Sequence, residues 1–114
     1  MQVSEIMVKD VFKLNSEDTV AKALNMMADK SVNQIPVVDD NGKHLGMIFA
    51  KHLLNSTAQP SSKLKSYIVN TSAIGPDHDV EKAAQLVLGS GNRALPVVEK
   101  GRLVGIVSET DLVS

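Results

Sequence analysis

The sequence has no cysteine, no tryptophan and few aromatic residues of any kind, which together make up 3% of the chain. Without cysteine it can form no disulfide, thiolate nucleophile, iron–sulfur cluster or cysteine-ligated zinc site. The few aromatic rings also leave little for a platform on which the bases of a single strand could stack. These absences exclude thiol chemistry and argue against single-stranded nucleic acid as a ligand.

An excess of one charge sign and long apolar runs are also missing. The chain has 12 basic and 13 acidic residues and a net charge of −1, so a broad basic surface for duplex nucleic acid or anionic lipid is hard to assemble. The first residues lack the basic and apolar regions of a signal peptide, and no apolar run approaches the roughly 20 residues that a membrane span needs. We therefore expect a cytoplasmic protein that contacts neither membrane nor nucleic acid.

Patterns typical of catalysis and metal binding are absent from the sequence. His44, His52 and His78 lack the HExxH spacing of a zinc site and have no cysteine partners. Ser108, His78 and Asp111 supply the residue types of a hydrolytic triad, but no Gly-x-Ser-x-Gly turn holds the serine. No Gly-x-x-x-x-Gly-Lys-Ser/Thr loop occurs either, so nucleotide binding would not imply hydrolysis. We expect no enzyme, no catalytic residue, no metal and no cofactor.

What the chain does contain is an internal repeat. Ile-Pro-Val-Val at residues 35–38 recurs as Leu-Pro-Val-Val at residues 95–98, and Leu-Gly-Met-Ile at residues 45–48 recurs as Val-Gly-Ile-Val at residues 104–107. Within 114 residues each copy is too small to bury a good core, so the two should pack together as a single domain. The predicted boundaries are 1–55 for the first repeat, 56–63 for a polar linker and 64–114 for the second repeat.

Each repeat predicts the same order of elements, β-α-β-β-α. Thr19 and Asp79 are good helix N-caps, and the apolar residues after each recur at the spacing of a helix with one buried face. Gly89 and Gly91 supply a stop for the second helix. A turn that contains glycine then joins two apolar runs, which indicates a hairpin. The other predicted elements are extended segments at 11–14 and 71–74, hairpin strands at 35–38, 45–49, 95–98 and 103–107, and short closing helices at 51–54 and 109–113.

The proline-led runs, the glycine turns and the motif Gly-x-x-Ser-x-x-Asp at residues 105–111 together resemble the CBS domain pair, or Bateman module. The resemblance implies an α/β fold of the α+β type, with two tandem β-α-β-β-α repeats packed about a pseudo-twofold axis and a three-stranded sheet in each. It also implies a regulatory module, often a homodimer. Such a module binds AMP, ADP, ATP or S-adenosylmethionine between its repeats and changes their orientation. The alternative is a ligand-free dimerisation or scaffold module.

Ser108 and Asp111 are the leading candidates for ligand contact. An Asp one turn after a Ser, at the start of a helix, can accept hydrogen bonds from two ribose hydroxyls while the Ser hydroxyl and free backbone N–H groups face a phosphate. The same spacing is that of a capping box, in which the two side chains only complete the helix start. Both interpretations stay open, because a cap can also orient a ribose contact.

The resemblance implies further ligand contacts. Arg93, shortly before the proline of the second repeat, would hold phosphate oxygens with its planar guanidinium, and the alternative is a solvated surface arginine. Adenine contacts are implied from segments of both repeats. These residues are Met7, Phe12, Val32, Asn33 and Ile106. For the four apolar ones the alternative is plain core packing, and for Asn33 it is a role in a turn.

The first repeat departs from this pattern at three positions. Phe49 and His52 occupy the places that Ser and Asp hold in the second repeat, and Asn33 stands in place of the arginine. An imidazole cannot accept two ribose hydrogen bonds as a carboxylate does, and a phenyl ring adds bulk where a phosphate needs a donor. We therefore expect one nucleotide per chain.

Overall fold

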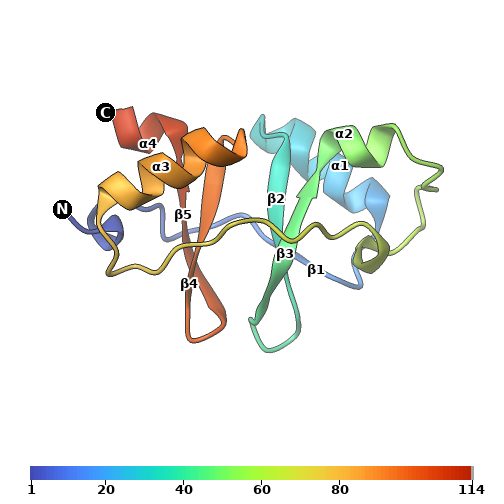
Figure 1. Cartoon of the computed structure of the whole chain (residues 1–114). Helices are drawn as coiled ribbons and strands as arrows, with labels where there is room; N and C mark the ends of the chain where they lie inside the picture. The colour runs from blue at the N-terminus through green and yellow to red at the C-terminus, as the bar shows by residue number, and fades with distance from the viewer. Residues whose placement is uncertain (114) are drawn as a thin grey trace. The chain divides into compact units, whose positions relative to one another are not determined.

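A computed structural model describes residues 1–113 and divides them into two compact units (Figure 1). Unit 1 consists of residues 1–11 and 71–113, and unit 2 consists of residues 12–70. Ser114, the last residue of the predicted second repeat, lies outside the described residues. The first residues of the chain thus belong to the unit that contains the second half of the sequence.

Unit 2 contains a three-stranded sheet in the order β1(Leu14–Asn15), β2(Gln34–Val38), β3(His44–Phe49). β1 pairs parallel with β2, and β2 pairs antiparallel with β3. The helices of this unit are α1(Val20–Lys30) and α2(Ala50–Leu54), and a 3-10 turn η2(Leu64–Ser66) follows them. The predicted elements of the first repeat are therefore confirmed, although the extended segment expected at 11–14 is a strand only from Leu14.

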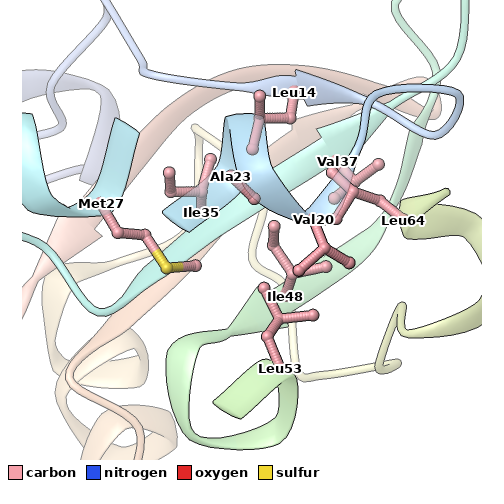
Figure 2. Close-up of a cluster of buried hydrophobic side chains, with 9 residues drawn as sticks. All are labelled: Leu14, Val20, Ala23, Met27, Ile35, Val37, Ile48, Leu53 and Leu64. Atoms are coloured by element: carbon pink, nitrogen blue, oxygen red, sulfur yellow. The ribbon is translucent and has the colours of Figure 1, made fainter. Parts of the chain in front are cut away.

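The core of unit 2 receives apolar side chains from every one of these elements. Helix α1 begins at a well-formed cap, in which the Thr19 side chain accepts a hydrogen bond from the Lys22 N–H at 3.2 Å. Its apolar face, Val20, Ala23 and Met27, is buried with side chains of the sheet. Figure 2 shows the buried cluster in which these side chains converge. Its members are Leu14, Val20, Ala23, Met27, Ile35, Val37, Ile48, Leu53 and Leu64.

Unit 1 begins with a 3-10 turn η1(Val3–Glu5) and continues, after the chain has passed through unit 2, with α3(Val80–Ser90), β4(Ala94–Glu99), β5(Arg102–Ser108) and α4(Glu109–Val113). β4 and β5 form an antiparallel two-stranded sheet. The resemblance implied a third strand here. The segment expected to form it makes only a single parallel bridge, from Ile74 to Val97, so the pairing is too short to count as a strand.

The predicted end of the second long helix is wrong at Gly89. Helix α3 passes through Gly89 and ends at Ser90, and Gly91 takes the left-handed conformation with φ 72°. The helix can continue because only the residue just after it needs a positive φ. Both α1 and α3 have 11 residues, and no described helix has the length and apolar character needed to cross a membrane.

The short segment that leads into each repeat packs in the unit of the other repeat. In unit 1, Val3 is fully buried and its N–H donates to the His78 carbonyl at 2.9 Å, while Val8 pairs antiparallel with Ile106. In unit 2, Val69 pairs with Met47 in the same way. This exchange assembles unit 1 from two separate pieces of the sequence.

Candidate functional site

The junction between β5 and α4 brings Ser108 and Asp111 into direct contact. The Ser108 N–H and hydroxyl both donate to Oδ2 of Asp111 at 2.9 Å, and the Asp111 N–H donates to the Ser108 hydroxyl oxygen at 3.2 Å. Both residues are half-buried. The arrangement is a reciprocal capping box, so the capping interpretation of this motif is confirmed.

The cap restricts how a ligand can use the same carboxylate. One oxygen of Asp111 already accepts two hydrogen bonds from Ser108, and a carboxylate offers about four acceptor sites in all. A ribose hydroxyl that binds Asp111 must therefore share the carboxylate with the cap. The cap also holds the carboxylate in one orientation. The side chain therefore loses less conformational entropy when a ligand binds.

The backbone of Arg93 is fixed beside this cap. Its carbonyl accepts a hydrogen bond from the Glu109 N–H at 2.7 Å, and the next residue, Ala94, pairs with Ser108 across the hairpin. The Arg93 residue is exposed. A guanidinium on an anchored backbone next to a helix start is suited to an anionic group that approaches from solvent.

Met7 and Ile106 also belong to unit 1 and are half-buried there. The segment after Met7 runs beside β5, since the N–H and carbonyl of Val8 form hydrogen bonds of 2.9 and 3.0 Å with Ile106. The approach is close because Gly105 has no side chain: a Cβ atom there would lie 2.6 Å from the Met7 sulfur. Five predicted site residues, the two above with Arg93, Ser108 and Asp111, thus share one unit.

The other three predicted site residues, Phe12, Val32 and Asn33, belong to unit 2 and are exposed. Phe12 is 46% and Val32 36% exposed, which excludes plain core packing as the account of either. The ammonium of Lys30 lies 4.9 Å from the centre of the Phe12 ring, within the range of a cation–π contact. The Asn33 carbonyl accepts a hydrogen bond from the Ala50 N–H at 2.9 Å.

The junction between β3 and α2 in unit 2 is the counterpart of the β5–α4 junction, and its side chains differ. Phe49 is buried, with 8% of its surface exposed. The exposed His52 packs edge-on against it with the ring centres 5.5 Å apart. Helix α2 begins without a side-chain cap. This junction therefore presents an aromatic ring where unit 1 presents a serine and a carboxylate.

No group of three or more His, Asp or Glu side chains is placed to hold a metal ion among residues 1–113. Burial lowers the pKa of His44 below its ordinary value of 6.5, and its Nδ1 atom is buried without a hydrogen-bond partner. This histidine lies in β3, in unit 2, outside the β5–α4 junction.

Sequence reasoning missed two residues that shape the junction, Val8 and Gly105. The glycine of the Gly-x-x-Ser-x-x-Asp motif was a usable signal, because a glycine inside a strand often marks the close approach of another backbone. The partner of that approach could not be read from the sequence. Val8 lies in a short segment without apolar periodicity.

Comparison with known proteins assigns the family. The family model of the CBS domain matches residues 3–58 and 68–114. The chain therefore belongs to the CBS domain family and carries two CBS repeats, as predicted.

Two curated relatives are much longer than this chain. Inosine-5'-monophosphate dehydrogenase of Methanocaldococcus jannaschii is 31% identical over 97% of this chain and 23% of its own length. Homoserine O-acetyltransferase of Methanohalobium evestigatum is 29% identical over 96% of this chain and 23% of its own length. The chain thus spans about a quarter of each of these relatives.

Solved structures confirm the mixed α+β fold. CBSX2 of Arabidopsis thaliana, crystallised in complex with AMP, matches with a TM-score of 0.88 and 25% identity over 98% of this chain and 92% of that one. The CBS domain pair of protein MJ0100, in complex with 5'-methylthioadenosine and S-adenosyl-L-methionine, matches with a TM-score of 0.85 and 24% identity over 99% and 93%.

Proposed function

We propose that this chain is a regulatory module that senses an adenosine-containing ligand, AMP, ADP, ATP or S-adenosylmethionine, and catalyses no reaction itself. The observation that carries the proposal is the Ser108–Asp111 pair, held beside the anchored backbone of Arg93 at one helix start. CBSX2 binds AMP and MJ0100 binds S-adenosylmethionine, and these complexes support the ligand class.

Each of the three residues has a distinct role in this proposal. Asp111 accepts hydrogen bonds from the ribose hydroxyls, Ser108 holds the carboxylate in place, and Arg93 binds the phosphate of a nucleotide. Met7 and Ile106 supply apolar contacts to the adenine from the same unit. The β3–α2 junction lacks this set, so we propose one ligand per chain.

We propose a cytoplasmic homodimer in which ligand binding favours one of two conformations, and a partner protein or a neighbouring domain responds to that conformation. Ligand binding can shift such an equilibrium only by the difference between its affinities for the two conformations.

A second candidate function is a ligand-free dimerisation or scaffold module. The observation that favours it is the completeness of the capping box, since the Ser108–Asp111 pair has a structural role without any ligand. The two candidates differ in a single measurable property, the affinity of the chain for adenosine compounds.

Titration calorimetry on the full chain with AMP, ATP, S-adenosylmethionine and adenosine tests the proposal. Asp111→Ala should weaken binding by about 1.5–3 kcal/mol, the range for hydrogen bonds to a charged group. Asp79→Ala is a matched control, because it removes another helix cap of the same unit, at the start of α3, where Asp79 Oδ1 accepts a hydrogen bond from the Glu81 N–H at 2.9 Å. It should lower stability and leave affinity unchanged.

Two results would overturn the proposal. If none of the four compounds binds the wild-type chain, the scaffold function is the better account. If they bind and Asp111→Ala binds equally well, the ligand lies elsewhere and the capping box is purely structural.

A further inference from the structure

Residues 39–43 form the turn between β2 and β3, and they contain an asparagine followed by a glycine. Asn41 is exposed, Gly42 has a φ of 81°, and the turn lies at the end of the hairpin away from α1 and α2 (Figure 1). The chain has seven asparagines, and Asn41 is the only one with a glycine after it. Because glycine has no side chain, its backbone nitrogen has little steric hindrance as a nucleophile toward the preceding side chain.

Asp39 holds this turn closed through four hydrogen bonds. Its carboxylate Oδ1 accepts from the N–H groups of Asn41 and Lys43, both at 2.9 Å. Its own N–H donates to the Lys43 carbonyl at 3.0 Å, and its carbonyl accepts from the Gly42 N–H at 3.0 Å. The proton on the Gly42 nitrogen is therefore engaged in a hydrogen bond as long as the turn keeps this form.

We propose that Asn41 is a site of spontaneous deamidation, and that the opening of the turn at Asp39 sets its rate in the folded chain. The Gly42 nitrogen attacks the side-chain carbonyl carbon of Asn41 and loses its proton. The bond from that carbon to Nδ2 breaks, and ammonia leaves with the proton, so that a five-membered succinimide remains. Water then opens this ring at either carbonyl and leaves an aspartate or an isoaspartate at position 41. Water is the only co-reactant, and no oxidant or reductant takes part.

The hydrogen bond from Gly42 to Asp39 protects the folded chain from this reaction. The nitrogen attacks through its lone pair as its proton leaves, so the turn has to open first. A hairpin tip opens at a lower free energy than the sheet beside it, because it buries few apolar side chains. Asp40 and Asn41 are exposed at this tip, whereas Val37 in the adjoining strand is fully buried. The folded rate is therefore the rate of the open chain multiplied by the fraction of open turns.

Deamidation changes unit 2 and has no counterpart at the corresponding turn of unit 1. The β4–β5 turn has Lys100 before Gly101, and lysine has no side-chain amide from which the imide could form. In unit 2, an aspartate at position 41 adds a third successive carboxylate after Asp39 and Asp40, and these like charges repel. An isoaspartate also lengthens the main chain of the turn by a carbon atom, so the hydrogen bonds between Asp39 and Lys43 cannot all persist.

Incubation of the full-length chain at mildly alkaline pH measures the reaction. Peptide mapping by mass spectrometry follows the gain of about 1 Da at each asparagine as an amide becomes an acid, and labelling by a protein isoaspartyl methyltransferase detects the isoaspartate. Asn41 should deamidate at least about tenfold faster than any of the other asparagines, and Asn41→Gln should remove the acidic species seen on ion exchange. Faster deamidation at another asparagine would overturn the proposal.

Variants of Asp39 test whether the turn controls the rate. For each variant, the rate in the folded chain is divided by the rate of the same chain unfolded in concentrated urea, which cancels the intrinsic effect of the sequence. Asp39→Ala should raise this ratio about tenfold, because it removes the acceptor of two hydrogen bonds of the turn. Asp39→Asn should keep the ratio near that of the wild type, because its amide oxygen can still accept.

Asp40→Ala is the matched control. It removes the neighbouring carboxylate, whose Oδ1 accepts from Asn15 Nδ2 at 2.7 Å, outside the turn, so the ratio should not change. Equal ratios for Asp39→Ala and Asp40→Ala would overturn control by the turn. A wild-type chain that deamidates as fast folded as in urea would overturn it as well, even if Asp39→Ala fails to fold. No adenosine compound enters these measurements, so they leave the proposed function untouched.

Discussion

The β5–α4 junction of unit 1 and the β3–α2 junction of unit 2 share a backbone and differ in side chains. In each, the first N–H of the short helix donates to a carbonyl just before the proline-containing strand: Glu109 to Arg93 at 2.7 Å, and Ala50 to Asn33 at 2.9 Å. One junction carries a Ser–Asp cap, and the other carries a buried phenyl ring. The two repeats thus share the backbone hydrogen bond at this junction and differ in the side chains beside it.

The difference has a physical cause in each unit. In unit 2, the ring of Phe49 is buried and contributes apolar burial at the junction. In unit 1, Ser108 at the same place is half-buried, and its hydroxyl forms hydrogen bonds with the side chain and the N–H of Asp111 at the start of α4. Replacing a buried ring should therefore lower the free energy of unfolding more than replacing a capping side chain does.

The largest expected effect comes from removing these two counterparts. Phe49→Ala should lower the free energy of unfolding by about 3–5 kcal/mol, because it leaves a cavity beside the core. Ser108→Ala should cost only about 1 kcal/mol, the usual value of a helix cap. Urea denaturation of both variants measures the contrast. Equal losses would show that the two junctions are energetically alike.

A smaller difference is expected between the two close-approach glycines. A Cβ at Gly46 would lie 2.7 Å from the backbone carbonyl oxygen of Val69, and its φ is +150°, so Gly46→Ala should cost about 2–3 kcal/mol. A Cβ at Gly105 would lie 2.6 Å from the sulfur of the flexible Met7 side chain and 3.0 Å from the Val8 carbonyl oxygen, so Gly105→Ala should cost about 1 kcal/mol.

Gly89→Ala is the control for both glycine variants. No atom lies within 4 Å of a Cβ at that helical position, so the substitution should raise the melting temperature slightly through helix propensity. A Gly105→Ala variant less stable than Gly46→Ala would mean that the Met7 side chain cannot move aside.

Arg93→Asn gives unit 1 the residue that unit 2 has at the same place. If the guanidinium holds a phosphate, the affinity for AMP should fall about tenfold, while the affinity for adenosine stays the same. Calorimetry with both ligands checks this, with Arg102→Asn as the control arginine on the hairpin. An equal loss for both ligands would assign Arg93 to the fold or to the adenine instead.

The smallest expected effect concerns pH. His44 of β3 corresponds to Leu103 of β5 in the repeat alignment, and burial lowers its pKa in the folded chain. Below pH 6.5 the unfolded chain takes up a proton before the folded chain does, so stability is complete above that pH and falls as the pH drops. His44→Leu should remove this part of the pH dependence. Melting curves of both chains at pH 7.5 and 5.5 measure it.

Much of the fold could be predicted from local patterns. Thr19 and Asp79 act as caps because their side chains can reach backbone N–H groups within one turn, and such signals depend only on neighbouring residues. The hairpins follow from apolar runs on either side of Gly42 and Gly101, both of which have positive φ. The capping box was readable from the motif for the same local reason.

What could not be predicted depends on contacts between distant residues. The bridges of Val8 to Ile106 and of Ile74 to Val97 each pair a single residue of an irregular segment with a strand. One paired residue is too little to leave a periodic signal in the sequence. Gly89 lies inside α3 because the left-handed residue that ends the helix comes two positions later, at Gly91. The ligand itself leaves no trace in secondary-structure patterns, so the site residues stay predictions for the binding experiments.

The exchange of leading segments also sets the order in which the chain can fold while it is being made. Unit 2 is a continuous stretch, so all of its strands exist once residue 70 has been synthesised. Unit 1 must wait, since its Val8 finds the partner Ile106 only about 5–20 s after Val8 itself has been synthesised, at common rates of translation. During that time the apolar side chains of the first turn have no core to enter. A nascent chain therefore carries a finished unit with a loose apolar end, which is the stage at which a chaperone or a wrong partner has the longest opportunity to bind.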